Sequence, residues 1–441
     1  MSFIESFINI LKEHREYSIL STLLFVNKAL YTFISTFKIK AIKVKSIADY
    51  NKWKYLNSSF VIAFNVVHLN YKNIVGLDLS YINNKIEDIS MLTNLTKLNL
   101  GENNNIKDID PSIDLTSLNL FNNNIKDISM LTNLTKLNLK NNKTISNISM
   151  LIKLTSLDLS FNNNIKDIST LTKLTILYLN YNNNIKDISM LTKLTKLSLW
   201  ENGVIKDISM LTNLTSLSLY SNHIISDISM FINLISLDLS FNTVIEDISM
   251  STNLTSLDLS FNDNIKDIST LTKLTILDLQ TNDSIKDISM LSNLTSLNLY
   301  DNTMIKNISM FINLTSLNLQ DNYFIKDISM LTNLTKLNIS NNNTIEDISM
   351  LTNLIKLNIR NNNIVKDINM LTKLTRLFLF DNKNIKDIST LTNLIKLNIG
   401  YNNHIKDISM LTNLSTLHAY KNKIVYNTDT LTNLTDLNII E

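Results

Sequence analysis

LTNLTKLNISNNNTIEDISM, residues Leu331–Met350, is one copy of a 20-residue unit that recurs 15 times without a gap between Leu131 and Thr430. The copies share apolar residues at positions 1, 4, 7, 9, 15 and 18, counted from the first leucine, and asparagine at position 12. One unit alone cannot bury its apolar face, so a fixed period of this length predicts a solenoid in which each unit stacks on its neighbours.

The repeats extend beyond this regular run. Three units of 19 to 21 residues precede it from Tyr71, and a partial unit, Leu431–Glu441, follows it. The length changes fall in the asparagine-rich turn, which is therefore expected to be a loop. The predicted domains are residues 71–441, a solenoid of 18 repeats plus a partial one, and residues 1–70, which have a different pattern.

The spacing within one repeat predicts its path. Alternation in L-x-L places positions 7 and 9 on the inner face of a short strand and positions 6, 8 and 10 on the open face. We expect a right-handed solenoid with a parallel β-sheet on its concave side. Twenty residues leave little room for a helix, so extended or 3₁₀ segments are expected on the convex side.

Asparagine has two predicted roles in the turn. The amide at position 12 is expected to pair with backbone groups that would otherwise be buried without a partner, and stacked repeats would turn these asparagines into a ladder. The asparagines at positions 13 and 14 suit left-handed backbone angles in a chain with only 4 glycines.

Composition narrows the class of partner. The chain has 41 lysines and arginines against 39 aspartates and glutamates, a balance that argues against nucleic acid or membrane as partners. Absence of cysteine excludes disulfides. Glu5 stands where a secretory signal would be basic, and Lys28 interrupts the longest apolar run. We therefore expect a cytoplasmic or otherwise intracellular protein.

The sequence offers no catalytic or metal-binding pattern. Its 5 histidines are scattered without metal-ligand spacing, and neither a Ser-His-Asp set nor a phosphate-binding glycine loop is present. The prediction is a protein that is not an enzyme and has no catalytic residues, no metal and no cofactor. Methionine recurs at position 20, where Thr170 and Thr270 replace it without disturbing the pattern. We expect this position to be partly buried.

The pattern L-x-x-L-x-x-L-x-L-x-x-N-x-x-I-x-D-I resembles the short leucine-rich repeats of the protein-phosphatase-regulator and internalin type. The repeat departs from that type in its period, which is 20 residues instead of the usual 22, and by an extra residue in the asparagine turn. Members of this family bind proteins on the concave face of the sheet. The resemblance therefore implies a protein partner on that face and leaves the partner's identity open.

Large aromatic residues recur at positions 10 and 11, at the edge of the expected concave face, and exposed aromatic rows are typical of binding hot spots. Trp200 and Tyr220 are the strongest candidates. Those at position 11 have an alternative role, in which they fold against the asparagine turn and shield the core. The predicted partner-binding residues are Phe161, Tyr181, Trp200, Tyr220, Phe241, Phe261, Tyr300, Phe380, Tyr401 and Tyr420, and Phe121 shares the pattern.

Charge on the same face is uneven. Aspartates occupy position 8 in the middle of the chain, and cations gather towards its C-terminal part, an arrangement that would orient a charged partner. Random variation of solvated positions is the alternative. The two sets are Asp158, Asp238, Asp258 and Asp278, and Lys336, Lys356, Arg360, Arg376 and Lys396.

Residues 1–70 predict three short amphipathic helices and then an edge strand at Ile42–Lys45, which together would cap the first repeat. The segment INILKEHREYSILSTLLFVNKALYTFI, residues 8–34, also resembles an F-box, a helical module that docks on a Skp1-type adaptor of a ubiquitin ligase. By that resemblance the adaptor-docking residues are Leu11, Leu20, Leu24 and Val26. Two readings stay open: a stand-alone protein-binding module, with a host protein as a candidate partner, and an F-box-type substrate receptor.

Overall fold

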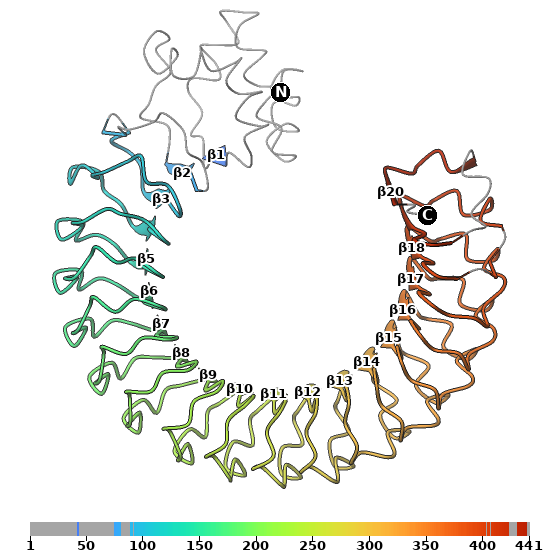
Figure 1. The fold of residues 1–441 in the computed structure, drawn as a ribbon. Helices are drawn as coiled ribbons and strands as arrows, with labels where there is room; N and C mark the ends of the chain where they lie inside the picture. The colour runs from blue at the N-terminus through green and yellow to red at the C-terminus, as the bar shows by residue number, and fades with distance from the viewer. Residues whose placement is uncertain are drawn as a thin grey trace, which may run out of the picture. The chain divides into compact units, whose positions relative to one another are not determined.

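The computed structural model describes residues 42–43, 75–80, 89–90, 92–402, 404–405, 407–422 and 430–438. The chain divides into two compact units, residues 1–198 with 202–211 and residues 199–201 with 212–441. Each unit carries a row of short parallel strands (Figure 1). The first unit holds β1 (Ile42–Lys43), β2 (Gly76–Asp78), β3 (Lys97–Asn99), β4 (Ser117–Asn119), β5 (Lys136–Asn138), β6 (Ser156–Asp158), β7 (Ile176–Tyr178) and β8 (Lys196–Ser198). The second holds β9 (Ser216–Ser218), β10 (Ser236–Asp238), β11 (Ser256–Asp258), β12 (Ile276–Asp278), β13 (Ser296–Asn298), β14 (Ser316–Asn318), β15 (Lys336–Asn338), β16 (Lys356–Asn358), β17 (Arg376–Phe378), β18 (Lys396–Asn398), β19 (Thr416–His418) and β20 (Asp436–Asn438).

Neighbouring strands pair in register, so that equivalent positions of successive repeats face one another. In β11 and β12, Leu257 pairs with Leu277. The strands cover positions 6 to 8, but the hydrogen bonds between repeats continue past them: the Leu259 amide donates to the Asp278 carbonyl at 2.9 Å, and the Phe261 amide to Gln280 at 2.9 Å. The parallel sheet predicted from the alternation is confirmed.

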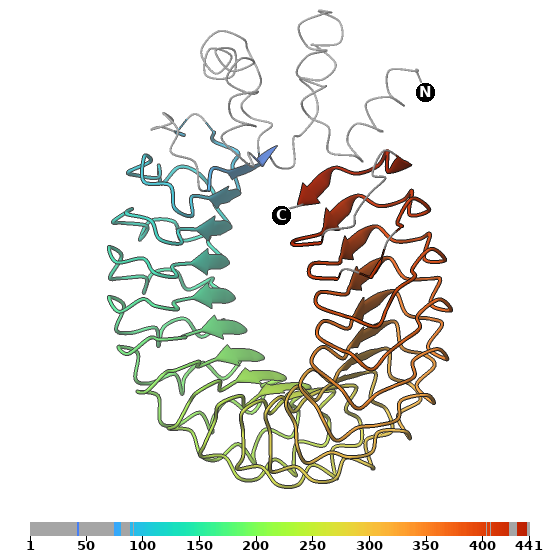
Figure 2. The same ribbon diagram turned by 45° about the vertical axis from the view of Figure 1, so that its right-hand side comes forward.

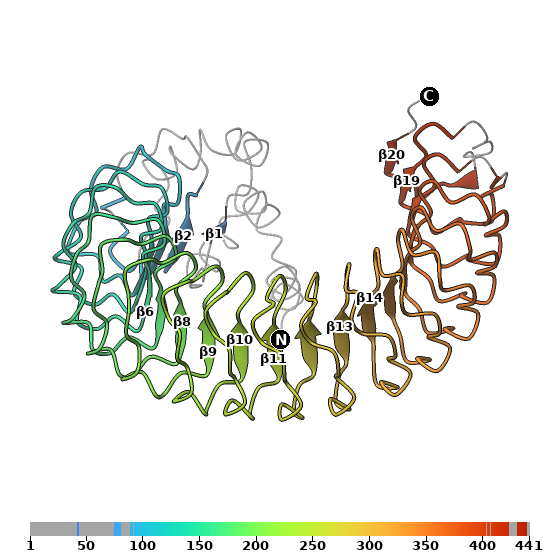
Figure 3. The same ribbon diagram turned by 60° about the horizontal axis from the view of Figure 1, so that its bottom comes forward.

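The apolar positions of the repeat form the core. The leucines and isoleucines at positions 1, 4, 7, 9, 15 and 18 are buried along both units, with few departures. In each unit the strands line the inner side and the connecting segments the outer side, as Figures 2 and 3 show. The outer segments are extended stretches joined by single turns, in which the Leu271 amide donates to Ile268 and the Leu274 amide to Leu271.

These turns have the hydrogen-bond spacing of a 3₁₀ helix, so the predicted extended and 3₁₀ character of the convex side is confirmed. Within the described residues no helix is long and apolar enough to cross a membrane.

The asparagine at position 12 holds neighbouring repeats together. Asn202 is 1% exposed, and its amide donates to the carbonyls of Leu179 at 3.1 Å and Asn182 at 2.7 Å. Its side-chain oxygen accepts from the amides of Val204 and Ile205. The same side chain therefore satisfies buried backbone groups of two repeats, which confirms the predicted ladder. At Asn402 the buried amide nitrogen has no partner among the described residues, so the ladder is weaker there.

Left-handed backbone occurs at position 11, one residue before this asparagine. Every described repeat from Glu102 to Lys421 has φ between 45° and 58° at this position. The prediction of left-handed angles at positions 13 and 14 is therefore wrong. Position 11 is the third residue of a turn closed by a hydrogen bond such as that from the Asn282 amide to Leu279, and a positive φ there is the mark of a type II turn.

Strain at this position leads to a prediction about Thr281, whose branched side chain is poorly suited to its φ of 49°. Thr281→Gly should raise the free energy of unfolding by about 1 kcal/mol, because relief of a left-handed L-residue outweighs the added freedom of glycine in the unfolded chain. Urea denaturation measures the change. Thr272→Gly is the control: Thr272 has no positive φ, so this variant should be less stable than the wild type. Equal changes in the free energy of unfolding for the two variants would show that Thr281 is not strained.

Of the predictions for residues 1–70, the described residues test one, the edge strand. β1 pairs in parallel with β2, with Ile42 opposite Leu77, so an edge strand begins where it was predicted. The predicted helices and the adaptor-docking residues Leu11, Leu20, Leu24 and Val26 lie outside the described residues. The domain boundary at residue 70 stays a prediction.

Candidate protein-binding surface

The open face of the sheet consists of the side chains at positions 6, 8 and 10. In β11 the flanking residues Ser256 and Asp258 point away from Leu257, which is buried. Repeats that differ little in the core differ strongly at these three positions. A surface that varies on a constant framework is where binding specificity is expected.

The predicted aromatic residues lie just beyond the strand ends and stack on one another. In the second unit, Trp200 and Tyr220 meet edge to face with ring centroids 4.8 Å apart. Tyr220 contacts Phe241 at 5.3 Å, and Phe241 stacks on Phe261 at 4.3 Å. We call these four residues the aromatic ladder.

The stacking follows from the repeat itself. Parallel strands lie about 4.8 Å apart, which is close to the separation of stacked rings, so equivalent aromatic residues in successive repeats meet without further adjustment. Phe161, Phe241 and Phe261 at position 11 keep 36–40% of their surface exposed. They neither fold away fully nor stand free, and their role in contact with a partner stays a prediction.

The remaining predicted aromatics form smaller groups. Phe161 stacks on Tyr181 at 4.6 Å in the first unit. Near the end of the second unit, Tyr401 contacts Phe380 at 5.1 Å and Tyr420 at 5.3 Å. Phe380 also lies under the Arg360 guanidinium, 4.7 Å away. Tyr300 falls between Gln280 and Gln320 at the same position of the neighbouring repeats and so belongs to neither group.

Three aspartates at position 8 form an acidic row on β10, β11 and β12. Asp238 pairs in register with Asp258, and Asp258 with Asp278. Each also closes a local turn: an Asp258 oxygen accepts from the amide of Ser260 at 2.9 Å and from its hydroxyl at 2.6 Å. Burial raises the pKa of Asp258 to about 6, and the neighbouring Asp278 and Asp238 add to the rise.

This pKa yields a prediction. Because the folded-state pKa lies above the usual 3.8, the contribution of Asp258 is most favourable below pH 4 and is lost as pH rises through about 6. Asp258→Asn keeps the oxygen that accepts from Ser260, as Asn298 does for Tyr300. The variant should gain about 1 kcal/mol at pH 8, a full two-unit shift being reduced by partial exposure.

Urea midpoints at pH 5 and pH 8 check this expectation. The control is Asp267→Asn at position 17, where a hydrogen bond from the Ser269 amide lowers the pKa of the carboxyl. The contribution of Asp267 to stability is therefore present in full at both pH 5 and pH 8. The control should show the same difference in urea midpoint between the two pH values as the wild type. A parallel shift of both variants would contradict a special role for Asp258.

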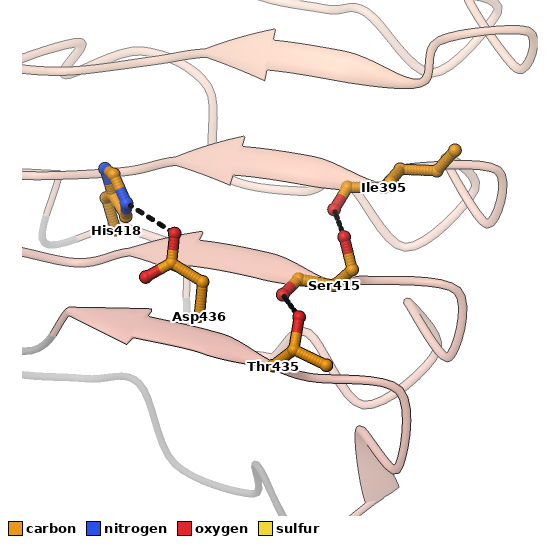
Figure 4. Close-up of polar contacts among 5 residues, drawn as sticks. All are labelled: Ile395, Ser415, His418, Thr435 and Asp436. Carbon is orange, nitrogen blue, oxygen red and sulfur yellow. Dashed lines mark hydrogen bonds and ion pairs between the residues drawn. The ribbon is translucent and has the colours of Figure 1, made fainter. Parts of the chain in front are cut away.

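Cations form a column at position 6 on β15 to β18. Lys336, Lys356, Arg376 and Lys396 pair in register, and we call these four residues the basic face. None of the four side chains forms a hydrogen bond or an ion pair with another described residue. Within the described part, the one ion-pair contact joins His418 Nε2 to Asp436 Oδ2 at 3.7 Å (Figure 4).

The sequence pattern did not predict the exposed apolar residues that lie beside the basic face. Position 5 is usually threonine or serine, whose hydroxyl donates to the same position of the preceding repeat, as Ser415 does to Ile395 (Figure 4). Ile355 and Ile395 replace it and are 41% and 43% exposed. With Thr375 between them, and together with three polar residues at position 3, they line a shallow groove of about 560 Å³. Because isoleucine fits the apolar consensus, only its register could have marked it as exposed.

The methionines at position 20 correct another prediction. Most of them, among them Met130, Met250 and Met330, are 41–66% exposed, so the expectation of a partly buried packing position is wrong. They stand in the outer turn, where Thr170 donates its hydroxyl to Ser149 instead. Replacement by a polar residue was the signal of exposure.

The comparisons with known proteins agree with this architecture. Models of leucine-rich repeats match residues 112–130, 152–193, 250–268 and 312–353. An internalin of Listeria monocytogenes is 30% identical over 73% of this chain and 86% of its own, with a TM-score of 0.39. The chain belongs to the leucine-rich repeat proteins.

Two further structures are similar in fold. A leucine-rich repeat protein of Leptospira interrogans has 28% identity and a TM-score of 0.50, over 76% of this chain and 91% of its own. TLR13, solved in complex with ssRNA13, has 25% identity and a TM-score of 0.58, over 83% and 70% of the two chains. No curated protein is similar enough to match.

Proposed function

We propose that this chain is a non-enzymatic scaffold that binds a partner protein on the open strand face, inside the cell. Leucine-rich repeat folds are typical of protein-interaction scaffolds, and the face carries side chains that the fold itself does not need. The observation that supports the proposal most is the second unit, where the aromatic ladder, the acidic row and the basic face share one sheet.

The test is capture of partners by the tagged chain with chemical cross-linking and mass spectrometry. Trp200→Ala/Tyr220→Ala should reduce recovery of the specific partner more than tenfold, since large aromatic residues dominate interface energies. Met330→Ala/Met350→Ala, on the outer turns, is the matched control. A partner that the first variant retains and the second loses would place binding on the outer side and overturn the proposal.

A second proposal is an F-box-type substrate receptor, in which residues 8–34 recruit a Skp1-type adaptor and the repeats select the target. It rests on the resemblance of that segment. Leu20→Asp/Leu24→Asp should then abolish capture of a Skp1-type adaptor while circular dichroism of the repeats stays unchanged. Loss of repeat structure in this variant would favour a plain cap, and failure of the intact chain to retain the adaptor would remove the proposal.

A further inference from the structure

We infer that the basic face binds an acidic amphipathic helix of the partner protein, an inference that rests on the proposed function. Three features of β15 to β18 lead to this occupant: the charge of the column, the apolar residues beside it and the spacing of the strands. All belong to the second unit.

The charges of the basic face are not balanced within the sheet. Lys336, Lys356, Arg376 and Lys396 occupy directly opposed positions on four adjacent strands, where like charges repel one another. At position 8 of these strands stand asparagines and Phe378, all uncharged. The acidic residues of these repeats lie elsewhere, at positions 11, 16 and 17. A bound anion would relieve this repulsion.

Apolar surface lies on both sides of the column. Ile355 and Ile395 precede Lys356 and Lys396 directly in the chain and line the groove of about 560 Å³. On the other side Phe378 is 43% exposed. A nucleic-acid backbone would leave this apolar surface without a partner, whereas a helix with acidic and apolar residues on one face would cover it.

The spacing of the cations selects a helix over an extended peptide. Adjacent strands lie about 4.8 Å apart, and helix residues three or four positions apart lie about 5–6 Å from each other. Alternate residues of an extended chain are about 6.6 Å apart and fall out of step over four strands. Acidic residues at i, i+4, i+7 and i+11 span about 16 Å along a helix, against about 14 Å for the column.

A labelled synthetic peptide tests the inference with the full chain. The peptide carries glutamates at i, i+4, i+7 and i+11 and leucines beside them, and fluorescence polarisation measures its affinity. Replacing the glutamates by glutamine should weaken binding more than tenfold. Lys356→Glu/Arg376→Glu should weaken it equally, and the outer-face control Lys366→Glu/Lys386→Glu less than twofold.

Ile355→Thr/Ile395→Thr separates a helix from a simple polyanion, because threonine is the usual residue at position 5 and preserves the fold. The peptide should lose at least fivefold in affinity, and an oligouridylate probe should not respond. Tighter binding of the oligouridylate than of the peptide, equal binding of a proline-interrupted peptide, or no peptide binding would each overturn the inference. Cross-links of a captured partner to the aromatic ladder in the last case would leave the proposed function standing.

Discussion

Asn242→Leu is expected to lower the free energy of unfolding by about 4 kcal/mol. The Asn242 side chain is fully buried and bonds four backbone groups. Its amide donates to Leu219 and to Asn222, and its oxygen accepts from Val244 and Ile245. Leucine leaves the Asn222 carbonyl and the Val244 and Ile245 amides without this partner, whereas the Leu219 carbonyl still accepts from the Asn222 amide. Each of the three losses costs about 1–3 kcal/mol before the turn relaxes.

Urea denaturation measures the loss, and amide hydrogen exchange locates it. Exchange should rise in the repeats on either side of residue 242, because each repeat contacts only its neighbours. Asn264→Leu is the control: position 14 is only partly buried and holds Val244 in the preceding repeat, so that change should stay within about 0.5 kcal/mol. Similar urea midpoints for the two variants would show that the buried asparagines at position 12 are not a source of stability.

Ser251→Leu should raise the free energy of unfolding by about 2 kcal/mol. Ser251 is 1% exposed and lies at position 1, a column that leucine or phenylalanine occupies in all the other regular repeats. A pocket of about 260 Å³ opens beside it, lined in part by Val244, Ile248 and Met250. Burial of a leucine side chain in this space contributes about 2 kcal/mol.

The same succession of phenylalanine and leucine is accommodated elsewhere in this column. Phe231 precedes Ser251 in the column, and elsewhere Phe311 is followed by Leu331 with both fully buried. Thermal and urea unfolding should therefore shift upwards together. Thr252→Leu, at an exposed neighbouring position, is the control and should change stability by less than about 0.5 kcal/mol. A destabilised Ser251→Leu would mean that the column cannot close around it.

The fold could be predicted almost completely because every repeat carries the same instructions. Alternation placed Leu257 in the core and Asp258 on the open face, and Asn at position 12 was assigned to buried backbone groups. The left-handed residue could not be predicted, because position 11 holds Phe241 or Thr281, whose own preferences oppose such angles. Hydrogen bonds between repeats impose the angle there, and these depend on the stack rather than on the residue.

The candidate surface was predicted in part. Register alone placed the aromatics and charges on one face, yet which rings touch depends on the neighbouring repeats: Phe241 finds Phe261, and Tyr300 lies between glutamines. The exposed Ile355 was hidden by its chemical type. A sequence shows what a position holds, and the side chains one repeat away decide what that residue can do.

Pairing in register has a consequence for how such a surface changes over generations. The segment near Leu154 recurs almost verbatim near Leu254, five repeats later, as a duplicated block would. Gain or loss of a whole 20-residue repeat keeps the register of every strand pair. Where that repeat lies between the acidic row and the basic face, the distance between them changes by about 4.8 Å. Copy number can therefore tune the distance between two binding elements without altering any residue in either.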